Sequence, residues 1–267
     1  PLIAIIPISF SVSPFMVFTD EMLTWPPDPD AWSLRWYKNM VGNCSADVVS
    51  STVPCSNKWM IGTVNSFFIG FIATFIATTL GTLAALGLSR PHMPYKGLIM
   101  AILISPMIVP LIITAAGMFF FYARINLVYS FTGIILAHVA LATPFVVITV
   151  TATLVGFDMN MVKASQSLGA RPVRTFFKVI MPLILPGVIS GALFAFITSF
   201  DEVVIVMFMA SLDQLTIPKQ MWAGIRQEIS PVILCMATCL VVLSILLLTT
   251  VELLRRRSEK LRGITSR

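Results

Sequence analysis

Charged residues are scarce in this sequence, and that scarcity excludes an ordinary water-soluble domain. Only 11% of the 267 residues are Asp, Glu, Lys or Arg, while 57% are hydrophobic. A soluble domain of this length has roughly a quarter of its residues charged. So few charges do not cover a surface that faces water, so the lipid bilayer must be the solvent for much of the chain.

Several kinds of site are also missing. The two histidines, His92 and His138, stand far apart, so we predict neither a metal site nor a catalytic Ser-His-Asp group. No Gly-x-x-x-x-Gly-Lys-Ser/Thr loop is present to hold a nucleotide phosphate. We therefore predict no enzyme activity and no cofactor in this chain, and energy has to come from another polypeptide. The net charge of +6 does not indicate nucleic acid, because the basic residues fall between and after apolar runs.

Long apolar runs are what the sequence does have. A bilayer core of ~30 Å requires about 20 helical residues to cross it, and none of the runs alternates with a strand period. We predict an all-α membrane protein with one transmembrane domain over residues 1–267. Its six predicted spans are about 2–18, 60–88, 98–122, 130–155, 185–210 and 232–254. Since Pro1 already lies in an apolar stretch without an initiator Met, we expect residues before it.

The basic residues predict the orientation of these spans, because cytoplasmic loops carry an excess of Lys and Arg. With both termini in the cytoplasm, twelve of the eighteen Lys and Arg lie on the cytoplasmic side. Residues 19–59 then form a periplasmic loop and residues 156–182 a cytoplasmic one. Cys44 and Cys55 lie in the outer loop, where an oxidising periplasm permits a disulfide, and two free thiols are the alternative.

The cytoplasmic loop 156–182 is too polar to span and too long for a simple turn. Asp158 is placed to cap a short helix over Met159 to Leu168. Gly169 suits the left-handed residue that ends a helix, and Pro172 suits the first turn of the next one. We predict a helix–turn–helix at the inner face of the membrane.

The same loop resembles the EAA motif of ABC importer permeases. The similarity lies in Lys163-Ala164-Ser165, in Gly169-Ala170 and in Ile180-Met181-Pro182. Further similarity over nearly the whole chain is greatest to the spermidine/putrescine-type permeases. It includes Arg35-Trp36-Tyr37 and the run Ser199-Phe200-Asp201-Glu202-Val203-Val204.

The resemblance implies a type I ABC importer permease fold in which the first helix of the loop is a coupling helix docked on an ATPase. The residues assigned to this coupling are Lys163, Ala164, Ser165, Gly169, Ala170 and Pro182. Lys163 stands where the family usually has Glu, which reverses the charge at the docking surface. The implied partners are a homologous permease subunit, two ATP-binding subunits that hold ATP and Mg, and a periplasmic substrate-binding protein.

Asp201 and Glu202 fall inside the fifth predicted span, with Thr198 one helical turn before them. A charge at the bilayer centre costs about 2.5–3.5 kcal/mol on insertion scales, so it normally faces a cavity or a partner. One interpretation is that Thr198, Asp201 and Glu202 line a pathway for a cation. The other is structural: a carboxylate that pairs with another helix, with Asn65, Arg124 or Arg226 as partner, or that caps a broken helix.

Together these features predict a bacterial inner-membrane importer subunit for a small cationic solute such as putrescine or spermidine. The alternative is a self-contained secondary transporter driven by a proton through Asp201 or Glu202.

Overall fold

The computed structural model describes residues 2–24, 28–42, 57–90, 92–155, 158, 160–227 and 230–261. Over these residues its regular structure is helical, as predicted, and it contains no strand, only an isolated antiparallel bridge between Ser11 and Trp32. The chain forms two compact units, which are described here one at a time. The first comprises Pro1–Met60 and Met221–Arg267, and the second Ile61–Gln220.

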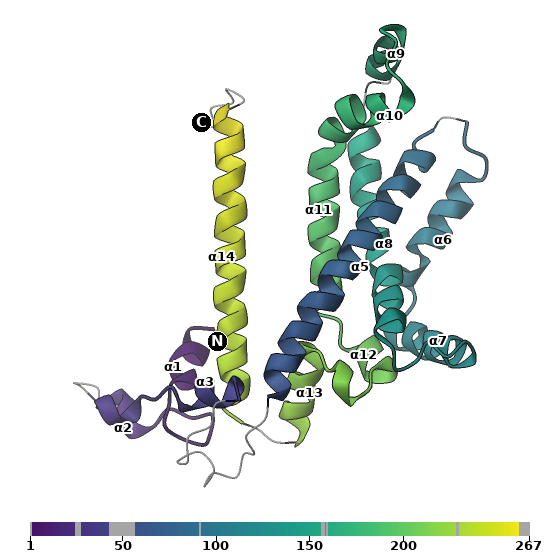
Figure 1. Ribbon diagram of the computed structural model, residues 1–267. Coiled ribbons are helices and arrows are strands. Elements are labelled where there is room, and N and C mark those ends of the chain that lie inside the picture. Colours follow the sequence, from purple (N-terminus) through teal and green to yellow (C-terminus); the bar gives the residue numbers. More distant parts are fainter. Residues whose placement is uncertain are drawn as a thin grey trace. The chain divides into compact units, whose positions relative to one another are not determined.

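The first unit packs short N-terminal helices against one long C-terminal helix (Figure 1). Trp36 is fully buried, and its indole N–H donates to the Ser11 carbonyl at 2.9 Å. The Tyr37 hydroxyl lies 2.7 Å from the Ser9 hydroxyl, and the Cys235 thiol donates to the Ser9 carbonyl at 3.3 Å. The helices of this unit are α1 (Leu2–Ser9), α2 (Asp20–Leu23), η1 (Pro29–Ala31), α3 (Arg35–Met40) and α14 (Val232–Leu261).

The predicted span 2–18 is wrong in its length, because α1 ends at Ser9. Serine hydroxyls past that point bond the nearby backbone and compete with the helix. The Ser11 hydroxyl accepts from the Ser13 N–H, and the Ser13 hydroxyl from the Phe15 N–H, both at 3.1 Å. The predicted outer loop 19–59 holds α2, η1 and α3, while Cys44 and Cys55 lie outside the described residues.

The second unit contains the long apolar helices (Figure 1). The predicted spans 60–88 and 130–155 coincide with two of its helices, α5 and α8, to within two residues. Its elements are α5 (Lys58–Leu88), α6 (Lys96–Ile108), α7 (Leu111–Arg124), α8 (Phe131–Val155), α9 (Asn160–Ser167), α10 (Pro172–Thr175), η2 (Phe176–Ile180), α11 (Met181–Phe200), α12 (Val204–Met209), η3 (Leu212–Gln214) and α13 (Ile217–Gln227). Of these, η2 is a turn of π-helix that continues into α11. The first residues of α5 and the last residues of α13 belong to the first unit.

The core of this unit is the contact between α8 and α11, which depends on small residues. A Cβ at Gly187 would collide with the Thr153 hydroxyl, and one at Gly191 would lie 2.5 Å from the Thr149 hydroxyl. Small residues let transmembrane helices approach closely when lipid provides no hydrophobic drive between them. The contact with α8 fixes the position of α11, and therefore also positions the segments at its two ends, α10 with η2 before it and α12 after it.

The predicted span 98–122 is wrong as a single helix. Its residues form α6 and α7, which meet at 103° across a short break. The break follows from Pro110, since a residue before proline is pushed out of the helical region, and Val109 is extended with φ −71° and ψ 135°. The predicted span 185–210 is broken as well, with α11 ending at Phe200 and α12 beginning at Val204.

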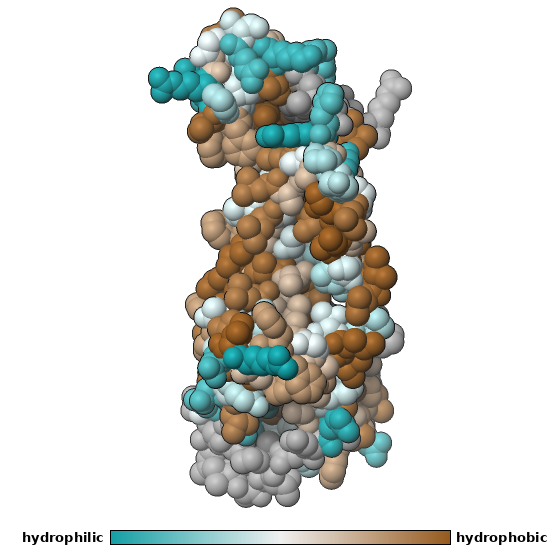
Figure 2. Space-filling model, turned by 90° about the vertical axis from the view of Figure 1, so that its right-hand side faces the viewer, coloured by the Kyte–Doolittle hydropathy of each residue, from teal (hydrophilic) through white to brown (hydrophobic). Residues whose placement is uncertain are grey.

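Three described helical segments are long and apolar enough to cross a membrane, or four if the α6–α7 pair counts as one span. They are Lys58–Leu88, Phe131–Val155 and Pro172–Phe200, and α14 adds a shorter apolar stretch, Val232–Leu246. Figure 2 shows a face that is hydrophobic along the helix shafts and hydrophilic at the end where α9 lies. Exposed phenylalanines on the shafts include Phe71 and Phe75 of α5. Such a surface is typical of helices whose surroundings are lipid or another apolar chain.

Candidate functional site

The loop between α8 and α11 begins with a capped helix. The Asp158 carboxylate accepts the Asn160 N–H at 2.9 Å, and its carbonyl accepts the Met161 N–H at 3.2 Å. A side-chain acceptor before the first turn satisfies backbone donors that the helix leaves free. The cap that the sequence predicts at Asp158 is therefore present, and α9 runs from Asn160 to Ser167.

Two backbone bonds and one left-handed residue end α9. The Gly169 N–H donates to the Gln166 carbonyl at 2.9 Å, and the Ala170 N–H donates to the Ser165 carbonyl at 3.1 Å. These are the two bonds of a Schellman motif, which requires a left-handed residue at its centre. Gly169 has φ +79°, as its position in the sequence predicts.

The chain then turns into a second helix. Arg171 is extended and Pro172 occupies the first turn of α10, where its missing N–H has no cost. The Ser165 hydroxyl lies 3.0 Å from the hydroxyl of Thr175, which is buried, so one hydrogen bond ties α9 to α10. The predicted helix–turn–helix is thus present, and it continues through η2 into α11.

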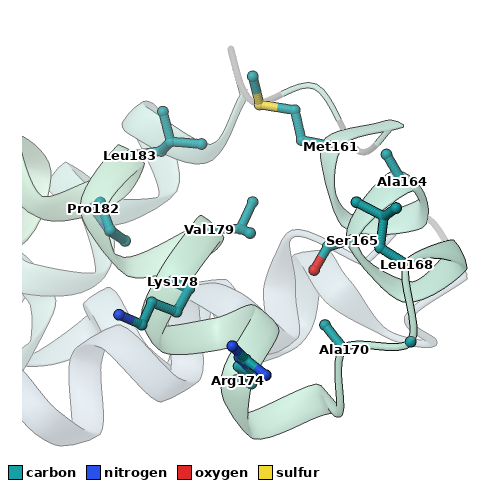
Figure 3. A pocket seen from close by; sticks show the side chains of 11 residues that line it. Met161, Ala164, Ser165, Leu168, Ala170, Arg174, Lys178, Val179, Pro182 and Leu183 are labelled. Atoms are coloured by element: carbon teal, nitrogen blue, oxygen red, sulfur yellow. The ribbon is translucent and has the colours of Figure 1, made fainter.

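α9, the turn that ends it and the helical residues between Arg174 and Leu183 line an open pocket of about 900 Å³. In Figure 3, Met161 and Ala164 of α9, and Leu168 just after it, face Val179 and Leu183 across the pocket. Five of the six predicted coupling residues line this pocket: Ala164, Ser165, Gly169, Ala170 and Pro182. The sixth, Lys163, is exposed on α9 and does not line it.

The surroundings of the pocket are basic. Arg174 and Lys178 are exposed, line the pocket and lie near each other on one stretch of helix in Figure 3. Lys163 and Arg171 are exposed as well. The surface around an apolar pocket therefore carries several positive charges, an arrangement suited to binding an acidic partner.

The other predicted site lies at the far end of α11, and the structure separates its two acids. Asp201 is exposed, whereas Glu202 is 6% exposed and its carboxylate accepts the Ile205 N–H at 2.8 Å. Glu202 therefore caps the start of α12, which is the structural role that the sequence left open. Thr198 is half-buried on the last turn of α11.

Two of the three partners considered for these acids, Asn65 and Arg226, have other contacts. The Asn65 amide donates to the carbonyls of Asp213 and Leu215, both at 2.9 Å. The Arg226 guanidinium lies 6.0 Å from the centre of the Trp222 ring, within reach of a cation–π contact.

A comparison with known families matches residues 77–260 to the binding-protein-dependent transport system inner membrane component. The chain belongs to this family. It is thus a multi-pass transport subunit of a membrane rather than an enzyme.

Relatives of this inner membrane component carry informative names. It is 28% identical over 228 residues to the spermidine/putrescine transport system permease protein PotC of Haemophilus influenzae, covering 85% of this chain and 84% of that protein. Identity to PotC of Escherichia coli is 31% over 190 residues, 71% of this chain and 72% of the relative. The putrescine transport system permease protein PotI of Escherichia coli is 28% identical over 215 residues, 78% of this chain and 72% of the relative.

Solved structures share the fold. A bacterial ABC transporter involved in the import of alginate matches with a TM-score of 0.69 at 15% identity, over 94% of this chain and 89% of that one. The MetNI methionine ABC transporter matches with a TM-score of 0.54 at 20% identity, over 79% of this chain and 100% of that one. The inner membrane component therefore has the fold of ABC importer permeases.

Sequence reasoning missed a buried polar contact between α8 and α11. His138 in the middle of α8 is buried, and its Nδ1 lies 2.8 Å from the Ser199 hydroxyl near the end of α11. His138 stood out in the sequence only as an isolated polar residue within an apolar run. That signal predicts a hydrogen-bond partner, since buried polar groups are normally paired, but it does not say which one.

Proposed function

We propose that the chain is a six-span permease subunit of an ATP-driven importer in a bacterial inner membrane, with both termini in the cytoplasm. The orientation is supported by the distribution of Lys and Arg, twelve of which lie on the side assigned to the cytoplasm. In this arrangement the loop that contains α9 faces the cytoplasm. The break between α11 and α12 faces the periplasm.

The subunit works in a complex. A homologous permease subunit lies beside it, two ATP-binding subunits bind ATP and Mg on the cytoplasmic side, and a periplasmic binding protein delivers the solute. This composition is supported by membership of the binding-protein-dependent family and by the absence of a phosphate-binding loop from this sequence.

The function that we assign to α9 is coupling. One observation carries the proposal: a short capped helix, ended by a left-handed glycine, precedes the helical run Pro172–Phe200 and lines an open pocket with its first turns. The helix is tied to α10 by the Ser165–Thr175 bond, and α10 continues into α11. A push on α9 by an ATPase therefore reaches α11 through a continuous run of helix.

The solute that we assign is a polyamine such as spermidine or putrescine. The names of the relatives support this class, as does the exposed carboxylate of Asp201 at the end of α11. A carboxylate stabilises an ammonium group by charge and by hydrogen bonding. Thr198, one turn earlier, adds a hydroxyl on the same side of the helix.

A backbone substitution tests the coupling role. Gly169→Val places a β-branched residue at φ +79°, where a non-glycine residue costs roughly 1–2 kcal/mol. We expect ATP hydrolysis to continue while solute uptake per ATP falls, measured in proteoliposomes that contain the whole complex. Gly97→Val is the matched control, because Gly97 also has open space for a Cβ but lies inside a helix.

Two results would contradict the proposal. Unchanged uptake per ATP in Gly169→Val would remove the coupling role from this loop. Uptake by the chain reconstituted alone, driven by a proton gradient, would make it a secondary transporter instead.

A further inference from the structure

The segment from Asp158 to Leu183 has more basic than acidic residues. Its basic residues are Lys163, Arg171, Arg174 and Lys178, all of them exposed. The single acid among the described residues of this segment is Asp158, whose carboxylate accepts the Asn160 N–H in the helix cap. The segment therefore presents positive charge outward, with no carboxylate of its own beside Arg174 and Lys178.

The same surface is hollowed and partly apolar. Leu168 and Met161 are 88% and 49% exposed although they line the pocket, and Val179 and Leu183 form its opposite wall. A volume of about 900 Å³ accommodates more than one side chain of a partner. An apolar centre with a charged rim is the usual composition of a protein–protein contact.

We propose that this pocket receives a segment of the ATP-hydrolysing subunit that is acidic, with an apolar side chain in the pocket and carboxylates opposite Lys163, Arg174 and Lys178. The inference rests on the proposed function, because it assumes that α9 docks on that subunit. It adds the chemistry of the partner surface: the part of the ATP-binding subunit that contacts α9 and the pocket is negatively charged.

Anionic lipid headgroups are the other source of negative charge at this face of a membrane. Cations alone are sufficient to attract a headgroup, so lipid does not explain the pocket beside these cations. In Figure 1, α9 also lies beyond α10 at the tip of its unit, further from the helix shafts. The observations therefore favour a protein partner.

Zero-length cross-linking tests the charge assignment in the assembled complex. A carbodiimide joins a lysine amine to a carboxylate that touches it, forming an amide while the carbodiimide takes up the oxygen as a urea. We expect Lys163 and Lys178 to become linked to Asp or Glu of the ATP-binding subunit, identified by mass spectrometry. Lys163→Arg is the control, since it keeps the charge but should lose the link at that position.

A photoreactive amino acid at Leu168 separates this inference from the function beneath it, because its capture does not depend on charge. Capture of the ATP-binding subunit at position 168 without carbodiimide links would leave the coupling role intact and overturn the acidic character of the partner segment. If neither the carbodiimide nor the photoreactive residue at position 168 links this chain to the ATP-binding subunit, the coupling role is overturned as well. Carbodiimide adducts of Lys163 with a serine phospholipid, in place of the ATP-binding subunit, would assign the cations to the membrane.

Charge reversal gives an independent measurement. We expect Lys163→Glu to weaken association with the ATP-binding subunit about fivefold, since it replaces an attraction at the rim with a repulsion. Lys96→Glu is the matched control, because Lys96 is exposed at the start of α6 on the face assigned to the cytoplasm. Equal affinities for both variants, or tighter binding by Lys163→Glu, would overturn the proposal.

Discussion

The loop around α9 and the break before α12 lie at the two ends of the same run of helix, Pro172–Phe200. In the loop, each turn of the backbone is decided within a few residues: the Asp158 carboxylate accepts the Asn160 N–H, and Gly169 adopts a positive φ. At the break, an apolar run continues from Leu185 to Ala210, but α11 ends at Phe200 and the Glu202 carboxylate accepts the Ile205 N–H at the start of α12. Caps and turns that depend on neighbouring residues can be predicted from a sequence. Which of two adjacent carboxylates caps a helix and which is exposed cannot.

The largest effect that we expect separates those two carboxylates. Asp201→Asn removes the exposed charge, and uptake of a polyamine by the reconstituted complex should fall about tenfold or more. A hydrogen bond to a charged group contributes roughly 1.5–3 kcal/mol, which corresponds to at least that factor. The measurement is initial uptake rate at low solute concentration.

Asp213→Asn is the control for this prediction. Asp213 is also exposed, but its carbonyl, and not its carboxylate, accepts the bond from Asn65. Uptake in Asp213→Asn should remain near the wild-type rate. If Asp201→Asn behaves in the same way, the carboxylate at the end of α11 has no part in the pathway.

Much of the fold follows from the sequence, and the errors share one cause. Helix positions such as α5 and α8 follow from apolar runs of the right length. Hydropathy does not register where the backbone leaves the helix inside such a run, so the bend of 103° between α6 and α7 was missed. Pro110 was a readable signal for it, because the residue before a proline avoids the helical region. The contact between His138 and Ser199 joins residues 61 apart in sequence, and no local pattern indicates it.

A smaller effect is expected at Glu202, where the role is structural. Glu202→Ala removes the acceptor for the Ile205 N–H and should lower stability by about 1 kcal/mol, as for other lost caps. Glu202→Gln keeps an oxygen at that position, so both its thermal unfolding midpoint and its uptake rate should stay close to those of the wild type. A loss of uptake in Glu202→Gln as large as in Asp201→Asn would return Glu202 to the pathway.

A local effect on stability is expected at the hydrogen bond between α9 and α10. The Ser165 hydroxyl meets the Thr175 hydroxyl at 3.0 Å, and Thr175 is 2% exposed, so Ser165→Ala leaves a buried hydroxyl without this partner. We expect a cost of about 1–3 kcal/mol, which should appear as faster amide hydrogen exchange in α9 and α10 with α8 unchanged. Ser167→Ala is the control, because its hydroxyl donates to the Lys163 carbonyl within the same helix. Equal exchange in both variants would mean that the Ser165–Thr175 bond does not stabilise α9. The cap at Asp158 and the turn at Gly169 would then be sufficient to position this helix.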